Sequence, residues 1–327
     1  MGEALCTVES LKKYYPVKNG FRKKNWGSVR AVDGVSFEID RGEILGLVGE
    51  SGSGKTTVGK TMLNLAPPTG GRLTFDGKLL FDIGAKRDIQ RGEMDVVRRN
   101  MQMIFQDPYA SLDPKMTIEK TITEGMVKYK TCPKNQLHEE AARLIEMCGL
   151  DGGSLRKYPN QFSGGQRQRV GIARALSLKP RLIICDEPTA ALDVSIQSQI
   201  LNLMLELKEK LGMSYLFISH NLSVVEHFCD RVCVMYLGTI VESAATAELF
   251  SSALHPYTRA LLFSAPSINR RNKENRTLLS GEIPSPVNPP PGCKFHTRCP
   301  YAAERCRTEV PLQREVAPRH YVACHQA

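Results

Sequence analysis

The eight-residue stretch Gly49-Glu50-Ser51-Gly52-Ser53-Gly54-Lys55-Thr56 constrains the fold of this chain more than any other feature. It matches the pattern G-x-x-x-x-G-K-[ST] at every fixed position. The apolar run Ile44–Val48 before it is short enough for a buried strand, and residues 56–65 after it are compatible with a helix. The pattern therefore predicts a strand, a glycine-rich loop and a helix in succession.

The residues of this loop suit a bound polyphosphate. Glycine adopts backbone conformations that other residues avoid, so successive N–H groups can turn toward one anion. The N-terminus of the following helix adds positive potential. Lys55 supplies a positive charge for the β- and γ-phosphates, and the hydroxyl of Thr56 can bind Mg²⁺. A chance glycine-rich turn is the alternative, and the flanking strand and helix argue against it.

A second apolar run ends in two carboxylates. Residues 182–185 are apolar, and Asp186 and Glu187 follow them directly. Carboxylates at the end of a buried strand are costly without a cation or another partner. We expect Asp186 to hold Mg²⁺, directly or through water, and Glu187 to polarise the attacking water as a general base. Acidic residues often end strands, so this interpretation depends on the phosphate loop.

A second potential anion-binding helix start lies at Ser163-Gly164-Gly165-Gln166, before a helix-compatible stretch that runs to Leu178. By itself it would be an ordinary loop and helix cap. One chain cannot easily use both this segment and the phosphate loop on one nucleotide. The pair of motifs therefore predicts a head-to-tail dimer in which this segment acts on the nucleotide of the partner.

The arrangement of apolar runs predicts an α/β fold with a parallel sheet. Residues 182–185 and 215–219 resemble buried strands, and apolar residues recur at helical spacing over 137–150 and 196–211. Two further runs, 232–236 and 239–242, flank Gly238 and predict a hairpin. A short helix is expected over 256–265, followed by a proline-rich linker.

Composition adds two restrictions. No stretch approaches the roughly 18 apolar residues that cross a bilayer, and the N-terminus lacks an apolar signal region. We therefore expect a cytoplasmic protein that another chain would anchor at a membrane. The net charge of +10 could attract nucleic acid, anionic lipid or nucleotide phosphates, but solubility alone explains it equally well. We expect no nucleic-acid partner.

Together these motifs, in this order, resemble the nucleotide-binding subunits of ABC transporters over residues 5–255. Ser163–Gln166 corresponds to the ABC signature, with Phe162 in place of the usual leucine before the serine. Gln106 corresponds to the Q-loop glutamine, Asp193 to the aspartate of the D-loop, and His220 to the switch histidine. Alone, Gln106 and His220 would be an ordinary loop glutamine and strand-end histidine.

The resemblance implies an ATP hydrolase that uses Mg²⁺. Its catalytic residues would be Glu187, His220 and Gln106, and Mg²⁺ would be held by Thr56, Gln106 and Asp186. The aromatic residue that stacks on adenine would be Tyr15, with Tyr14 open as the alternative. The residues implied in ATP binding are Tyr15, Gly49, Glu50, Ser51, Gly52, Ser53, Gly54, Lys55, Thr56 and Thr57.

A narrower resemblance covers almost the whole chain. The segments 98–114, 255–262 and 289–325 are similar to the oligopeptide and dipeptide importers, and within them to the F-type ATPase subunit. This resemblance implies two transmembrane permease subunits, a second ATPase of the D type, an extracytoplasmic peptide-binding protein, and a peripheral position on the cytoplasmic face of the inner membrane. Nickel importers share much of the pattern, so the solute stays open, as does a homodimer against a heterodimer.

Two other classes of protein are disfavoured. A soluble ABC ATPase of DNA repair or translation fits poorly with a single signature and with the segment 105–114. A regulatory or structural nucleotide binder would not need the intact Glu187 and His220.

The tail carries four cysteines of its own: Cys293, Cys299, Cys306 and Cys324. A segment of about 35 residues cannot bury enough apolar surface to fold alone, so a metal or disulfides are usual in such units, and a cytoplasmic location disfavours disulfides. Four thiolates suit Zn²⁺ or a [4Fe–4S] cluster. The importer resemblance implies the cluster, with zinc and four unligated cysteines as alternatives.

We thus expect a P-loop core with an antiparallel β subdomain and an α-helical subdomain at about residues 107–165. The nucleotide-binding domain would span residues 1–255, and a small C-terminal extension residues 256–327.

Overall fold

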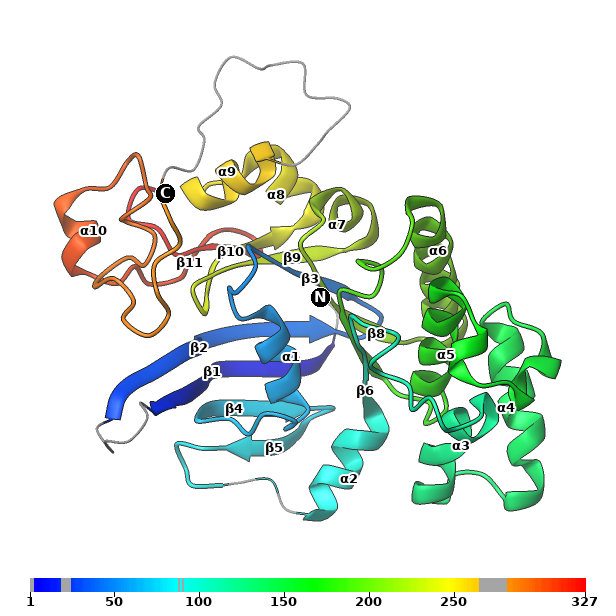
Figure 1. The fold of residues 1–327 in the computed structure, drawn as a ribbon. Helices are drawn as coiled ribbons and strands as arrows, with labels where there is room; N and C mark the ends of the chain where they lie inside the picture. Colours follow the sequence, from blue (N-terminus) through cyan, green and yellow to red (C-terminus); the bar gives the residue numbers. More distant parts are fainter. Residues whose placement is uncertain (1–2, 19–24, 88, 90, 265–280) are drawn as a thin grey trace. The chain divides into compact units, whose positions relative to one another are not determined.

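The computed structural model describes residues 3–18, 25–87, 89, 91–264 and 281–327. They form two compact units (Figure 1). The first combines residues 1–89 with residues 218–327, and we call it the discontinuous unit. The second, the inserted unit, spans residues 90–217. The expected division at residue 255 into a nucleotide-binding domain and an extension stays a prediction.

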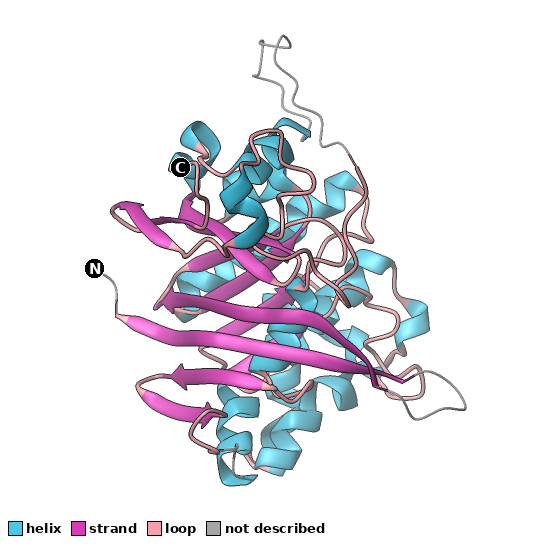
Figure 2. Ribbon diagram, turned by 90° about the vertical axis from the view of Figure 1, so that its left-hand side faces the viewer, coloured by secondary structure: helices cyan, strands magenta, loops and turns pink. Residues whose placement is uncertain are grey.

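An antiparallel sheet forms the first part of the discontinuous unit, as Figure 2 shows in magenta. Its strands lie in the order β2-β1-β4-β5. Apolar residues alternate along them and bury one face, including Val8, Leu11, Val35 and Phe37. The strands are β1 (Ala4–Lys18), β2 (Asn25–Asp40), β4 (Gly70–Phe75) and β5 (Lys78–Asp82). The expected antiparallel subdomain is therefore present.

The second sheet of this unit has the order β11-β12-β10-β9-β3. The strand before the phosphate loop, β3 (Ile44–Val48), is fully buried and pairs in parallel with β9 (Arg231–Tyr236). β9 and β10 (Thr239–Ala245) form the predicted hairpin around Gly238, whose φ of 80° suits glycine. The tail adds the edge strands β12 (His320–Val322) and β11 (Arg314–Ala317), which sequence patterns did not predict.

Helices of the discontinuous unit are short. α1 (Lys55–Met62) follows the phosphate loop, and it ends earlier than the predicted 65 because Asn64 adopts a left-handed φ of 53°. α7 (Leu222–Phe228), α8 (Thr246–Ser252) and α9 (Pro256–Ser264) follow along the chain, with α10 (Glu304–Thr308) in the tail. The helix predicted over 256–265 corresponds to α9.

The inserted unit is mainly helical (Figure 1). Strands β6 (Met101–Ile104) and β7 (Leu182–Asp186) pair in parallel, and β8 (Ser214–Ser219) lies beside β7 at the boundary between the units along the chain. The helices are α2 (Arg91–Asn100), α3 (Ile118–Tyr129), α4 (Leu137–Met147), α5 (Gly164–Leu176) and α6 (Val194–Leu211).

Helices α3, α4 and α5 pack on one another through apolar stripes that the periodicity predicted in part. Ile122, Ile145 and Val170 are fully buried among them. α6 ends where Gly212 takes a left-handed φ of 63° and its N–H bonds the carbonyl of Lys208, an ordinary glycine stop. The predicted α/β class with antiparallel and helical parts is confirmed.

Candidate functional site

The phosphate loop connects β3 to α1 in the discontinuous unit. Gly49 and Gly54 adopt left-handed φ angles of 150° and 106°. A Cβ on Gly54 would lie 2.0 Å from the carbonyl oxygen of Ala31, so only glycine fits there. The first turn of α1 then begins directly at Lys55. Glycine at position 54 is thus required both by its backbone conformation and by the close approach of the Ala31 carbonyl.

The Lys55 side chain lies across this loop and is buried. Its Nζ donates to the carbonyl oxygens of Gly49 at 2.8 Å and Glu50 at 2.9 Å, and lies 3.4 Å from Oγ of Ser53. The ammonium group is therefore held inside the concave loop, where a charge for a polyphosphate is required. Around it, Ser51 and Gly52 are exposed, while Thr56 and Thr57 are half-buried in the first turn of α1.

Two tyrosines of β1 compete for the adenine-stacking role, and their environments differ. The hydroxyl of Tyr14 donates to the Asp33 carboxylate, and burial, together with this bond, raises the pKa of Tyr14 to about 12. Tyr15 is 39% exposed, and Nζ of Lys13 lies 4.8 Å from its ring centroid. The Tyr14 hydroxyl is engaged with Asp33 whereas Tyr15 is exposed, and Tyr15 stays the predicted stacking residue.

In the inserted unit, the structure brings two predicted catalytic residues together. Nε2 of Gln106, just after β6, donates to Oε2 of Glu187 at 2.9 Å. Asp186 is buried at the end of β7. Glu187 follows it with a left-handed φ of 46°, an uncommon conformation for a non-glycine residue. Such strain is concentrated at functional positions, and here the strained residue is the one whose carboxylate accepts the hydrogen bond from Gln106.

The signature segment forms a complete helix cap. Oγ of Ser163 accepts from the N–H of Gln166, and the Gln166 side chain accepts in return from the N–H of Ser163 at 3.0 Å. A Cβ on Gly165 would lie 2.5 Å from the Ile196 side chain of α6. Gly165 therefore lets this helix start lie close against the first turn of α6, which Asp193 precedes at the N-cap position without a side-chain capping bond.

His220 directly follows β8 and is exposed, and the next residue, Asn221, caps α7 through its side chain. The phosphate loop, Tyr15 and His220 thus belong to the discontinuous unit. Gln106, the carboxylates, the signature and Asp193 belong to the inserted unit.

The tail cysteines lie in the discontinuous unit. The N–H of Cys293 bonds the carbonyl of Cys306 at 2.8 Å. Burial raises the pKa of the Cys293 thiol to about 11, and the thiols of Cys306, Cys324 and Cys299 act in the same direction. Within the described residues, however, no group of three His, Cys, Asp or Glu side chains is arranged to hold a metal ion.

Comparison with known proteins identifies the family. The ABC transporter family matches residues 32–190, and the oligopeptide/dipeptide transporter C-terminal region matches residues 241–306. The oligopeptide transport ATP-binding protein AppF of Bacillus subtilis is 48% identical, over 99% of this chain and 97% of AppF. The chain belongs to the ABC transporter ATP-binding proteins. It is an ABC ATPase.

Other relatives and solved structures agree. The di/tripeptide transport ATP-binding protein DppF of Pseudomonas aeruginosa is 43% identical, over 99% of this ABC ATPase and 98% of DppF. The structure of cbiO1 from Clostridium perfringens, part of the transporter complex cbiONQ, has a TM-score of 0.64 at 27% identity and covers 76% of this chain and 92% of its own. The cassette MJ0796, described as a dimer bound to ADP and Pi, has a TM-score of 0.62 at 27% identity and covers 74% of this chain and 98% of its own.

Sequence patterns missed two residues that contact the phosphate loop of the ABC ATPase. Tyr257 and Arg298 both contact Glu50, although they lie far along the chain. The importer-like segments 255–262 and 289–325 contain them, and that likeness was the only available signal. Among the described helices, none is both long and apolar enough to cross a membrane.

Proposed function

We propose that this ABC ATPase hydrolyses ATP to drive the import of oligopeptides or dipeptides across the cytoplasmic membrane. The observation that carries the proposal is the match of both regions at once. The same relatives that share the phosphate-loop region also share the C-terminal region named for oligopeptide and dipeptide transporters. A nickel or other small-solute importer is the alternative, and a soluble ABC ATPase of DNA repair or translation is less well supported.

We assign the chemistry to the predicted residues. The loop Gly49–Thr57 and the exposed ring of Tyr15 bind ATP, and Thr56, Gln106 and Asp186 hold Mg²⁺. Glu187 activates the attacking water, and the 2.9 Å bond from Gln106 supports its orientation. His220 contacts the γ-phosphate. Mg²⁺ supplies charge neutralisation at the phosphate oxygens when it is bound.

The dimeric cassettes among the similar solved structures support a proposal for the assembly. We propose a head-to-tail pair in which Ser163–Gln166 of one ATPase completes the nucleotide site of the other. The second ATPase is a D-type chain. The ATPase pair drives two transmembrane permeases, and an extracytoplasmic binding protein delivers the peptide. The chain then lies peripherally on the cytoplasmic face of the inner membrane.

The assembly can be tested by reconstitution. The purified chain alone should be a poor ATPase, because its signature cannot complete its own site. Addition of the D-type ATPase and both permeases should raise the rate, and peptide with its binding protein should raise it further. Full activity in a strictly monomeric preparation would refute the shared site, and uptake of nickel but not peptide by the reconstituted vesicles would reassign the solute.

We further propose that Cys293, Cys299, Cys306 and Cys324 hold a [4Fe–4S] cluster with a structural role. Four cysteine thiolates are the usual ligands of such a cluster. The proposal rests on these four cysteines and on the likeness of residues 289–325 to the peptide importers. The cluster would supply a cross-link for a tail with little apolar surface.

The metal content tests this assignment. Protein purified without oxygen should be brown and contain about four irons per chain. Cys306→Ser should lose most of this iron, whereas Cys132→Ser, a half-buried cysteine of the inserted unit, should keep it. Colourless protein with one zinc per chain would refute the cluster, and metal-free protein with an ordered tail would refute metal binding.

A further inference from the structure

Glu50, the second residue of the phosphate loop, is held by two residues from the C-terminal part of the chain. Its backbone N–H donates to Oη of Tyr257 at 3.0 Å. Its carboxylate accepts two hydrogen bonds from the guanidinium of Arg298, at 2.8 and 3.2 Å. This bidentate pairing is the strongest geometry for an arginine and a carboxylate. Backbone and side chain of one loop residue are thus both fixed from outside the loop.

The two residues that hold Glu50 are themselves rigidly packed. Tyr257 is fully buried in α9, and its ring lies 4.7 Å from that of Tyr236 and 5.5 Å from that of Phe295. Arg298 is 7% exposed, and its guanidinium lies 5.9 Å from the Tyr236 ring centroid. The pairing with Glu50 raises the pKa of Arg298 further above its usual value, so the charge is permanent. A contact from such a rigid base restricts the loop more than one from a mobile surface residue.

We propose that Arg298 and Tyr257 are positioning residues for ATP binding, through which the C-terminal extension holds the phosphate loop in its binding conformation. A carboxylate in a phosphate loop repels a triphosphate unless a cation neutralises it, and Arg298 supplies that cation. Tyr257 fixes the peptide group between Gly49 and Glu50. The inference rests on the proposed role of the loop as the ATP site, and it is independent of the metal proposed at the cysteines.

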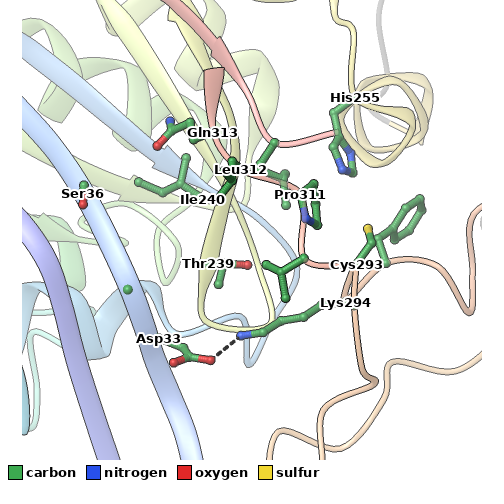
Figure 3. A pocket seen from close by; sticks show the side chains of 16 residues that line it. Asp33, Ser36, Thr239, Ile240, His255, Cys293, Lys294, Pro311, Leu312 and Gln313 are labelled. Atoms are coloured by element: carbon green, nitrogen blue, oxygen red, sulfur yellow. Dashed lines mark hydrogen bonds and ion pairs between the residues drawn. The ribbon is translucent and has the colours of Figure 1, made fainter. Parts of the chain in front are cut away.

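The Arg298–Glu50 contact is not needed merely to hold the C-terminal tail in place, because other ion pairs of the tail do this. Lys294 bonds Asp33 at 2.8 Å, beside a cavity of about 200 Å³ between the tail and the β9–β10 hairpin (Figure 3). Arg319 bonds Asp40 at 2.8 Å, and buried His320 bonds Glu242 at 2.9 Å. Of these four tail residues, Arg298 alone has its ion-pair partner in the phosphate loop.

The test compares Arg298→Met with Arg319→Met in the full-length chain. Each variant removes one arginine of the tail from an ion pair of the same length, 2.8 Å. The partner of Arg319 lies on β2, whereas the partner of Arg298 lies on the phosphate loop. The affinity for a fluorescent ATP analogue with Mg²⁺ is measured by titration. Arg298→Met should weaken binding about fivefold to tenfold, because the unpaired Glu50 carboxylate then repels the triphosphate through a solvated site. Arg319→Met should bind within about twofold of wild type, since surface ion pairs contribute little.

Three further readouts separate positioning from stability. In the assembled transporter, Arg298→Met should raise KM for ATP several-fold with little change in kcat, and Arg298→Lys should restore part of the affinity. The double variant Glu50→Gln with Arg298→Met should bind ATP more tightly than Arg298→Met alone, because the unpaired carboxylate is gone. Equal analogue affinity for Arg298→Met and wild type would overturn the proposal, as would an equal loss in Arg319→Met. Wild type that binds no nucleotide would instead refute the ATP site itself.

Discussion

Replacing Glu187 by Gln is expected to lower ATP hydrolysis by on the order of 10²-fold or more in the assembled transporter, within the range for losing a positioned base. ATP binding should persist, because the charges that hold the phosphates are on Lys55 and the loop. The amide keeps the shape of the side chain but is not basic enough to activate water. Phosphate release measures the rate, and the variant should accumulate as an ATP-bound dimer.

The matched control for this prediction is Glu206→Gln. Glu206 lies on α6 of the same unit and forms only an exposed ion pair with Lys210 at 3.7 Å. Its hydrolysis rate should stay within about twofold of wild type, because surface ion pairs contribute little. Wild-type turnover by Glu187→Gln would show that another group activates the water.

The second large effect is expected for Gly54→Ala. A Cβ there would lie 2.0 Å from the carbonyl oxygen of Ala31, and the φ of 106° is unfavourable for alanine. Backbone strain alone costs about 1–3 kcal/mol, and the contact forces the loop to move as well. ATP affinity should therefore fall by about 100-fold or more, which corresponds to about 2.7 kcal/mol.

Gly52→Ala separates the two causes. Gly52 has a left-handed φ of 78° in the same loop, but a Cβ there meets no atom within 4 Å. The Gly52→Ala variant has the conformational cost without the collision, so we expect its affinity for ATP to fall about tenfold or less. Similar affinity losses in the two variants would show that packing against Ala31 is unimportant, and unchanged affinity in Gly54→Ala would contradict the cradle described here.

The C-terminal part of the chain gains a physical role from these contacts. The importer-like segment at residues 255–262 contains Tyr257, and the cysteine-rich segment contains Arg298, one residue before Cys299. Both residues form hydrogen bonds with Glu50. The C-terminal part of the chain thus supports the phosphate loop as proposed above, with or without a metal at the cysteines.

The elements that sequence alone predicted are those whose causes are local. The apolar strand Ile44–Val48, the hairpin at Gly238 and the helix over 196–211 each follow from a pattern of residues within a few positions of one another. Periodicity and glycine conformation express such causes directly. The order of the motifs added the family, since several specific patterns in one sequence rarely coincide by chance.

The tertiary structure decided what depends on distant pairings. Arg298 and Glu50 are 248 positions apart, and Gln106 and Glu187 are 81 apart. No periodicity connects such residues; only the folding of the strands and loops that carry them does. The hydrogen bond between Tyr14 and Asp33 across the β1–β2 pair has the same origin. Sequence thus specified the phosphate loop and its neighbours, whereas packing determined which distant side chains orient and support them.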